Sequence, residues 1–158
     1  MIAEVGVGPS KSGKPPILLK FVDEARCLIG LDLAENEFRG AIVNLRGEIK
    51  HRLNWPINGG DVSGTLASID ALIDRLRRLS TSPLLGIGIG APGLIDSQHG
   101  VVRYAAKLDW REIRLGEMLA RKHGLPVHIA NDCQAAALAE FTFGNGNGHE
   151  PNLIVIKA

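Results

Sequence analysis

The chain has 158 residues, 45% of them hydrophobic and 22% charged, with a formal net charge of +1. This is the composition of an ordinary soluble protein, long enough for one packed domain. The longest apolar run, residues 83–95, is too short and too rich in glycine to span a bilayer, and the first residues lack the pattern of a signal peptide. The near-neutral charge argues against a nucleic-acid-binding surface on this chain itself.

The two cysteines, Cys27 and Cys133, lie far apart in the sequence and form no disulfide framework. This usage is typical of a reduced compartment, so we expect a cytoplasmic location without contact to a membrane. The five histidines show no metal-ligand spacing with each other or with the cysteines, and we expect neither a metal nor a cofactor.

The first third of the chain predicts strands after a linker. Residues 5–16 read VGVGPSKSGKPP, which favours a loop over a regular element. The apolar runs at 17–21 and 27–33 predict strands. Residues 38–45 and 48–53 flank an Arg-Gly pair, a tight-turn signal that predicts a β-hairpin.

From Asp61 onward the apolar period changes from that of a strand to that of a helix. Apolar residues at spacings of three and four predict a helix over residues 61–79, capped by Asp61 or Ser63. Arginines at its end complement the helix dipole, and a role in nucleic-acid binding is the less favoured reading of them. The remaining expectations are a strand at 84–89 buried on both faces, a loop at 90–100, a strand at 101–105, a helix at 113–123 closed by Gly124, a buried strand at 126–130, a helix at 132–143, a loop at 144–151 and a last strand at 152–156.

This order of elements predicts an α/β domain. A hairpin followed by βα units implies a mixed sheet covered by helices. The chain stops inside its last expected strand, which is not how a finished domain ends. We therefore expect the C-terminus to be a truncation of a longer protein.

Two motifs follow the ends of predicted strands. Residues 88–93 match the glycine pattern of dinucleotide-binding loops, but the segment at 94–100 has turn chemistry and opens no helix, so NAD binding is disfavoured. The loop stays a candidate for contacting a small polar ligand through its backbone. Asn131 and Asp132 open the helix at 132–143. They either cap this helix or bind a ligand hydroxyl, and both roles are compatible.

Taken together, these segments resemble the ROK family of repressors and sugar kinases. The resemblance covers roughly residues 17–158. It rests on the following segments, in this order: Gly30-Leu-Asp32-Leu, Arg39 to Ile49, Gly86 to Asp96, Gly100-Val-Val, Leu108-Asp-Trp110 and Pro126 to Glu140.

The resemblance implies an actin-like (ribonuclease-H-like) ATPase fold, with this chain as its N-terminal lobe and a mixed five-stranded sheet with helices. In the family's kinases, the Asp that matches Asp132 is the base that deprotonates the sugar. The residues that match Asn131 and the Pro92-Gly93 loop contact the sugar. Asp32 would belong to the nucleotide site.

The resemblance also separates a regulator from a kinase. Family kinases carry Gly-Gly-Thr after the strand of Asp32, whereas this chain has Ala34-Glu-Asn-Glu37. Two like charges at about 4 Å repel by about 1 to 4 kcal/mol, so carboxylates there oppose a triphosphate. Residues 1–16 look like the remnant of a winged-helix wing and a linker, and residues 17–158 like the truncated lobe.

We therefore expect a non-catalytic, sugar-sensing effector fragment of a ROK-type transcriptional regulator. DNA would be bound only through a missing N-terminal winged-helix domain, and we expect a homo-oligomer. The first alternative is a divergent ROK-type kinase fragment that phosphorylates a hexose with ATP. The second is a dimerisation module that has lost its ligand.

Overall fold

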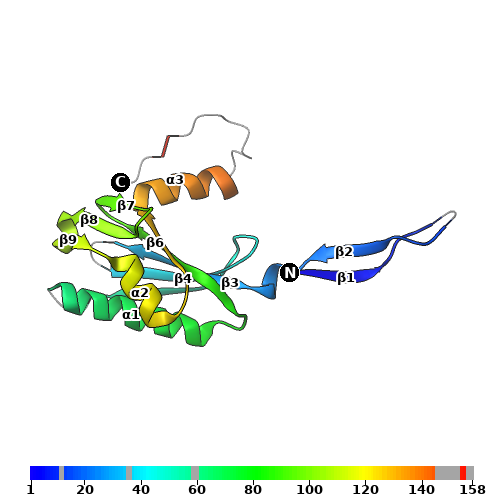
Figure 1. Ribbon diagram of the computed structural model, residues 1–158, viewed down its shortest axis with the longest axis horizontal. Coiled ribbons are helices and arrows are strands. Elements are labelled where there is room, and N and C mark those ends of the chain that lie inside the picture. Colours follow the sequence, from blue (N-terminus) through cyan, green and yellow to red (C-terminus); the bar gives the residue numbers. More distant parts are fainter. Residues whose placement is uncertain (11–12, 35–36, 58–60, 145–153, 156–158) are drawn as a thin grey trace.

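The computed structural model describes residues 1–10, 13–34, 37–57, 61–144 and 154–155. They form an α/β body from which a two-stranded hairpin projects (Figure 1). The strands are β1 Ile2–Val7, β2 Ile17–Phe21, β3 Cys27–Leu33, β4 Glu37–Asn44, β5 Ile49–Pro56, β6 Leu84–Ala91, β7 Leu94–Asp96, β8 Val101–Ala105, β9 Trp110–Ile113 and β10 Val127–Asn131. The α-helices are α1 Val62–Leu79, α2 Leu115–His123 and α3 Asp132–Phe143, and the 3-10 helices are η1 Asp23–Ala25 and η2 Ala106–Leu108.

The body is built on a mixed five-stranded sheet, as the sequence predicted. Its strand order is β10-β6-β3-β4-β5. Strands β10, β6 and β3 run parallel, whereas β4 and β5 add antiparallel to one side. The carboxyl ends of β3, β6 and β10 therefore meet at one edge of the sheet.

The core lies on one face of this sheet. Alternate residues of β3 are buried there, and the amphipathic helix α1 packs over β4 and β5 with α2 beside it over β10 (Figure 1). Asp61 caps α1, because its side chain accepts the Gly64 N–H at 2.8 Å. The expectation that residues 84–89 are buried on both faces is wrong. Leu85 is 39% exposed, because α3 covers only part of the second face.

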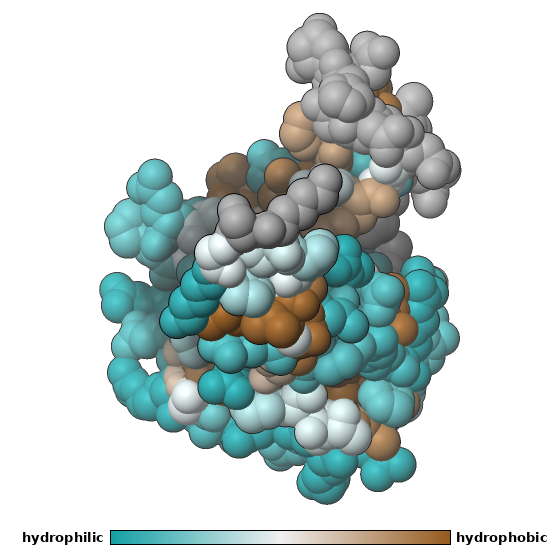
Figure 2. All heavy atoms as spheres, turned by 90° about the vertical axis from the view of Figure 1, so that its right-hand side faces the viewer, coloured by the Kyte–Doolittle hydropathy of each residue, from teal (hydrophilic) through white to brown (hydrophobic). Residues whose placement is uncertain are grey.

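The N-terminal segment is a hairpin where the sequence predicted a linker. Val5 to Val7 belong to β1, which pairs antiparallel with β2 across a bulge between Glu4 and Gly6. Apolar side chains on both strands favour this pairing over a loop. The strand expected at 17–21 exists, but its partner is β1 and not the main sheet. Figure 2 looks onto this end of the molecule and shows apolar surface at its centre. The exposed apolar residues of the hairpin are Ile2, Val5, Val7, Ile17, Leu18, Leu19 and Phe21.

A second sheet, of order β7-β8-β9, replaces part of the predicted loop and helix. Residues 94–96 form β7, and Trp110–Ile113 form β9, so α2 begins at Leu115 instead of Ile113. Burial explains the difference, because Trp110 is completely buried in the core. The helix ends as predicted at Gly124, whose φ of 66° is left-handed.

Helix α3 has the bounds that the sequence predicted, but none of its residues is buried. It lies on the opposite side of the main sheet from α1 and α2 (Figure 1). Its apolar side chains include Leu138, Phe141 and Phe143, which are 66%, 45% and 66% exposed. The loop and strand predicted after it fall almost wholly outside the described residues, and Ile154 and Val155 are assigned to no strand.

A buried histidine joins the two core helices. The side chain of His123 on α2 is 2% exposed, and its Nε2 lies 2.9 Å from Asp70 Oδ1 on α1. Its neighbour Lys122 reaches the other oxygen of the same carboxylate at 2.7 Å but is 59% exposed. If the hydrogen bond of the buried histidine is lost, water cannot replace it. The contact of the exposed lysine is screened by solvent and contributes less.

We predict that His123→Ala lowers the free energy of unfolding by about 2 to 3 kcal/mol, because it removes buried volume and a hydrogen bond. Lys122→Ala, which removes only the exposed contact to the same carboxylate, is expected to cost less than about 1 kcal/mol. Urea denaturation of the two variants measures both values. Equal losses would contradict the prediction.

Asp96, at the end of β7, forms hydrogen bonds that hold the second sheet together, and these are called the brace at Asp96. Its carboxylate accepts Arg103 Nη2 at 2.6 Å and the His99 backbone N–H at 3.2 Å. The bond from Arg103, followed by those from His99, lowers the pKa of Asp96 from 3.8 to about 2. A carboxyl group whose pKa is lowered by folding stabilises the native state above its unfolded pKa.

We predict that the contribution of Asp96 is complete above pH 3.8 and is lost as the pH falls through about 2. The difference in unfolding free energy between the protein and its Asp96→Asn variant should therefore shrink over that interval. Chemical denaturation at a series of pH values measures it. A difference that stays constant down to pH 2 would argue against the stabilising role of this carboxylate.

Candidate functional site

The carboxyl ends of β3, β6 and β10 bring the predicted site residues together. In the parallel register, Asn131 pairs with Ala91, directly before the Pro92-Gly93 bend, and Asp32 pairs with Gly90. Edges of this kind, where parallel strands end, are where open α/β sheets bind ligands. Segments far apart in the sequence thus converge on one edge.

The Pro92-Gly93 bend has a conformation that only glycine adopts easily. Gly93 has a φ of +94°, and a Cβ there would lie 2.9 Å from the Cα of Ala105, with the Tyr104 carbonyl oxygen nearer still. The bend therefore packs directly on β8 with exposed backbone at its surface. The side-chain amide of Asn131 donates to the Gly93 carbonyl at 3.0 Å, which connects this bend to the start of α3.

Asn131 is also the N-cap of α3, so one of its two predicted roles is confirmed. Its Oδ1 accepts the backbone N–H groups of Cys133 at 3.0 Å and Gln134 at 3.2 Å. Asp132 Oδ1 accepts the same Cys133 N–H at 2.9 Å. Both residues are half-buried at the N-terminus of α3, which is the positive end of the helix dipole.

Beside this pair, glycines leave part of the sheet surface open. A Cβ on Gly30 or Gly88 would meet nothing within 4 Å, whereas at Gly90 it would contact the backbone of Asp132 at 3.5 Å. Asp32 lies half-buried on the neighbouring strand. The strand ends thus combine open space over Gly30 and Gly88 with polar groups beside it.

The expected nucleotide side of the site is only partly described. Glu35 and Asn36 lie outside the described residues. Glu37 accepts hydrogen bonds from Arg39 Nε and Asn54 Nδ2, both at 3.2 Å. Arg39 pairs with Asp32 in the register of β3 and β4, so the carboxylate of Glu37 neutralises a cation next to this strand end.

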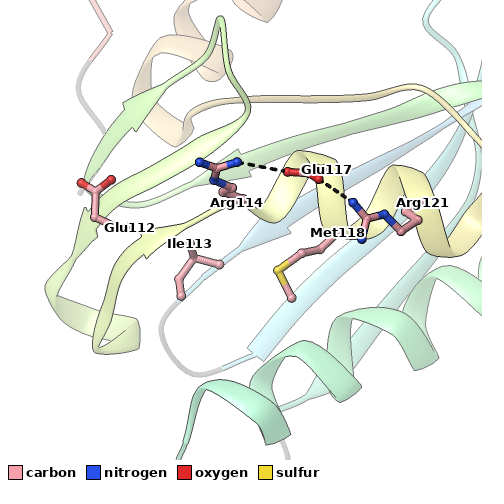
Figure 3. A pocket seen from close by; sticks show the side chains of 6 residues that line it. All are labelled: Glu112, Ile113, Arg114, Glu117, Met118 and Arg121. Atoms are coloured by element: carbon pink, nitrogen blue, oxygen red, sulfur yellow. Dashed lines mark hydrogen bonds and ion pairs between the residues drawn. The ribbon is translucent and has the colours of Figure 1, made fainter.

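A separate surface hollow of about 320 Å³ lies between β9 and α2 (Figure 3). None of the predicted site residues lines it. Arg121 and Arg114 both point toward Glu117, at 2.6 Å and 3.6 Å respectively, so the charged side chains of α2 that line the hollow already form ion pairs with each other. We place the candidate site at the strand ends instead. Among the described residues, no group of three or more possible metal ligands occurs.

The brace at Asp96 was missed by the sequence reasoning. Its spacing to His99 is that of an Asp whose side chain accepts a backbone N–H three residues later, a pattern that marks turns and that the sequence displays. Arg103 has no such local signal, because its contact with Asp96 depends on the pairing of β7 with β8.

Within the described part of the chain, no helix is both long and apolar enough to cross a membrane.

Relatives of the chain include repressors and kinases. A putative xylose repressor from Caldicellulosiruptor sp. (strain Rt8B.4) is 33% identical over 99% of the chain and 40% of its own length. A glucokinase from Halalkalibacterium halodurans is 34% identical over 82% of the chain and 41% of its own length. The chain thus spans about two fifths of the length of the curated relatives that it matches.

The solved structures that resemble the chain also include both a regulator and a kinase. A ROK family transcriptional regulator, described as a homologue of the E. coli MLC protein, superposes with a TM-score of 0.74 at 26% identity, over 80% of this chain and 33% of its own. A ROK family glucokinase from Streptomyces griseus, in complex with glucose and AMPPNP, superposes with a TM-score of 0.71 at 29% identity, over 78% and 38%.

The fold is therefore that of the actin-like sugar kinases. The model of the ROK family matches residues 28–157. The strand-end site and all of the mixed sheet except Cys27, the first residue of β3, lie within this range. The chain belongs to the ROK family.

Proposed function

We propose that this chain is the N-terminal lobe of the sugar-sensing domain of a ROK-type transcriptional regulator, and that it binds a sugar without phosphorylating it. The observation that carries the proposal is the convergence of Asn131 and Asp132 with the Pro92-Gly93 bend, tied by the 3.0 Å hydrogen bond from Asn131 to Gly93. Carboxylate, amide and exposed backbone groups are the partners that sugar hydroxyls need.

The carboxylate of Glu37 favours sensing over catalysis. Phosphoryl transfer needs donors and cations around the nucleotide phosphates. Here the carboxylate of Glu37 forms an ion pair with the guanidinium of Arg39, and Arg39 pairs with Asp32 on the neighbouring strand. The carboxylate of Glu37 therefore competes with any phosphate for this guanidinium. We therefore assign Asp132 the role of a hydrogen-bond acceptor for a sugar hydroxyl, and no catalytic role.

The hairpin β1–β2 supports the regulator as well. It precedes the part of the chain that matches the family model, which starts at residue 28. The repressor relative matches 99% of the chain and the glucokinase 82%. We propose that the hairpin is the wing of a winged-helix DNA-binding domain, which moves the domain boundary proposed at residue 17 to the end of β2. Such a regulator acts in the cytoplasm as a homo-oligomer.

We predict that Asp132→Ala weakens sugar binding by about tenfold or more, because it removes a charged acceptor of a hydroxyl. Glu140→Gln on the same helix removes an exposed carboxylate outside the site and is expected to change affinity by less than about twofold. Calorimetry with the complete protein, using D-xylose and D-glucose as probes, measures both. Equal affinities of the two variants, or no binding of a broad sugar panel, would count against the proposal.

The divergent kinase stays the second candidate, because a curated glucokinase is 34% identical to the chain. We expect the complete protein to release no ADP from ATP in the presence of D-glucose or another hexose, since Glu37 opposes the phosphates. A coupled assay for ADP checks this, with the Halalkalibacterium halodurans glucokinase as positive control. ATP-dependent formation of a sugar phosphate would decide for the kinase.

A further inference from the structure

The hairpin is joined to the body through the 3-10 helix η1, which side chains from the β4–β5 turn and from the start of β5 hold in place. Arg46 Nε donates to Asp23 Oδ2 at 3.0 Å, and Lys50 Nζ contacts Glu24 Oε1 at 2.6 Å. The backbone N–H of Leu45 also donates to the Asp23 carbonyl at 3.1 Å. The position of η1, which is the joint between hairpin and body, therefore depends on the position of this turn.

The side chain of Asn44 forms hydrogen bonds both with the β4–β5 turn and with η1, the joint between hairpin and body. It is 1% exposed, and its Nδ2 donates to Glu24 Oε1 and Glu48 Oε2, both at 3.0 Å. Its Oδ1 accepts the backbone N–H groups of Arg46 at 3.0 Å and Glu48 at 2.9 Å. A buried amide that satisfies donors and acceptors on both segments resists their separate movement, because any broken bond leaves a buried polar group unpaired.

The far end of α3 rests on this same turn. A Cβ on Gly47, whose φ is +87°, would lie 2.7 Å from a ring carbon of Phe143. Phe143 is the last residue of α3, and the helix begins directly after Asn131, the residue that binds Gly93. Between its two ends α3 lies on β6 and β10 through residues that are at most half-buried.

We propose that α3 couples occupancy of the strand-end site to the position of the hairpin, through the contact of Phe143 with the turn at Gly47. This inference rests on the proposed function. A ligand that takes over the hydrogen bonds of Asn131 or Asp132 shifts the start of the helix. Because a helix moves as a rigid rod, its far end shifts against Gly47 and biases the joint at η1.

The test uses hydrogen exchange of the Leu45 amide, which donates to η1, in the complete protein without ligand. Asn131→Asp keeps an acceptor for the helix cap but loses the donor to Gly93. Phe143→Ala removes the contact with Gly47. Leu138→Ala is the matched control, because Leu138 and Phe143 are both 66% exposed on the same helix.

We expect Asn131→Asp and Phe143→Ala each to speed this exchange by about threefold to tenfold, and the double variant to be no faster than the faster single one. Leu138→Ala should leave the rate unchanged. The inference is overturned if Asn131→Asp has no effect, if the two effects multiply, or if Leu138→Ala acts like Phe143→Ala. Failure of the complete protein to bind sugars contradicts the proposed function instead, since these exchange rates are measured without ligand.

Discussion

The parallel pairing of β6 with β3 and β10 is the constraint on which the rest of the molecule depends. It fixes the end of each strand at one edge, so residues separated by up to a hundred positions become neighbours there. The core reinforces it, because Ile29, Ile87 and Ile129 from the three strands are all at most 2% exposed on one face. A shift by one residue would turn this face to solvent and separate the site residues.

Patterns that are local in the sequence were sufficient for much of this fold. The period of α1, the Arg-Gly turn of the β4–β5 hairpin and the cap of α3 each depend on neighbouring residues, and each was predicted. The convergence of Pro92-Gly93 with Asn131 and Asp132 was expected from the family resemblance, whereas the hydrogen bond from Asn131 to Gly93 depends on tertiary structure.

The failures share a physical cause, which is partner strands that the local sequence does not reveal. Residues 94–96 and 110–113 are short and become strands only because β8 lies between them. Likewise, Val5 to Val7 read as part of a linker until β2 is placed alongside. The ion pair of Arg103 with Asp96 and the contact of Phe143 with Gly47 depend on tertiary structure, so no spacing rule finds them.

The projecting hairpin has a mechanical consequence. It is attached to the body at one end, through η1, and a strand rises by about 3.3 Å per residue, so the six residues of β1 make an arm of about 20 Å. A rotation of only about 10° at the joint displaces the tip of such an arm by about 3.5 Å, roughly the rise of one residue along a strand. The length of the hairpin thus turns even a small rotation at η1 into a displacement of several ångströms at its tip.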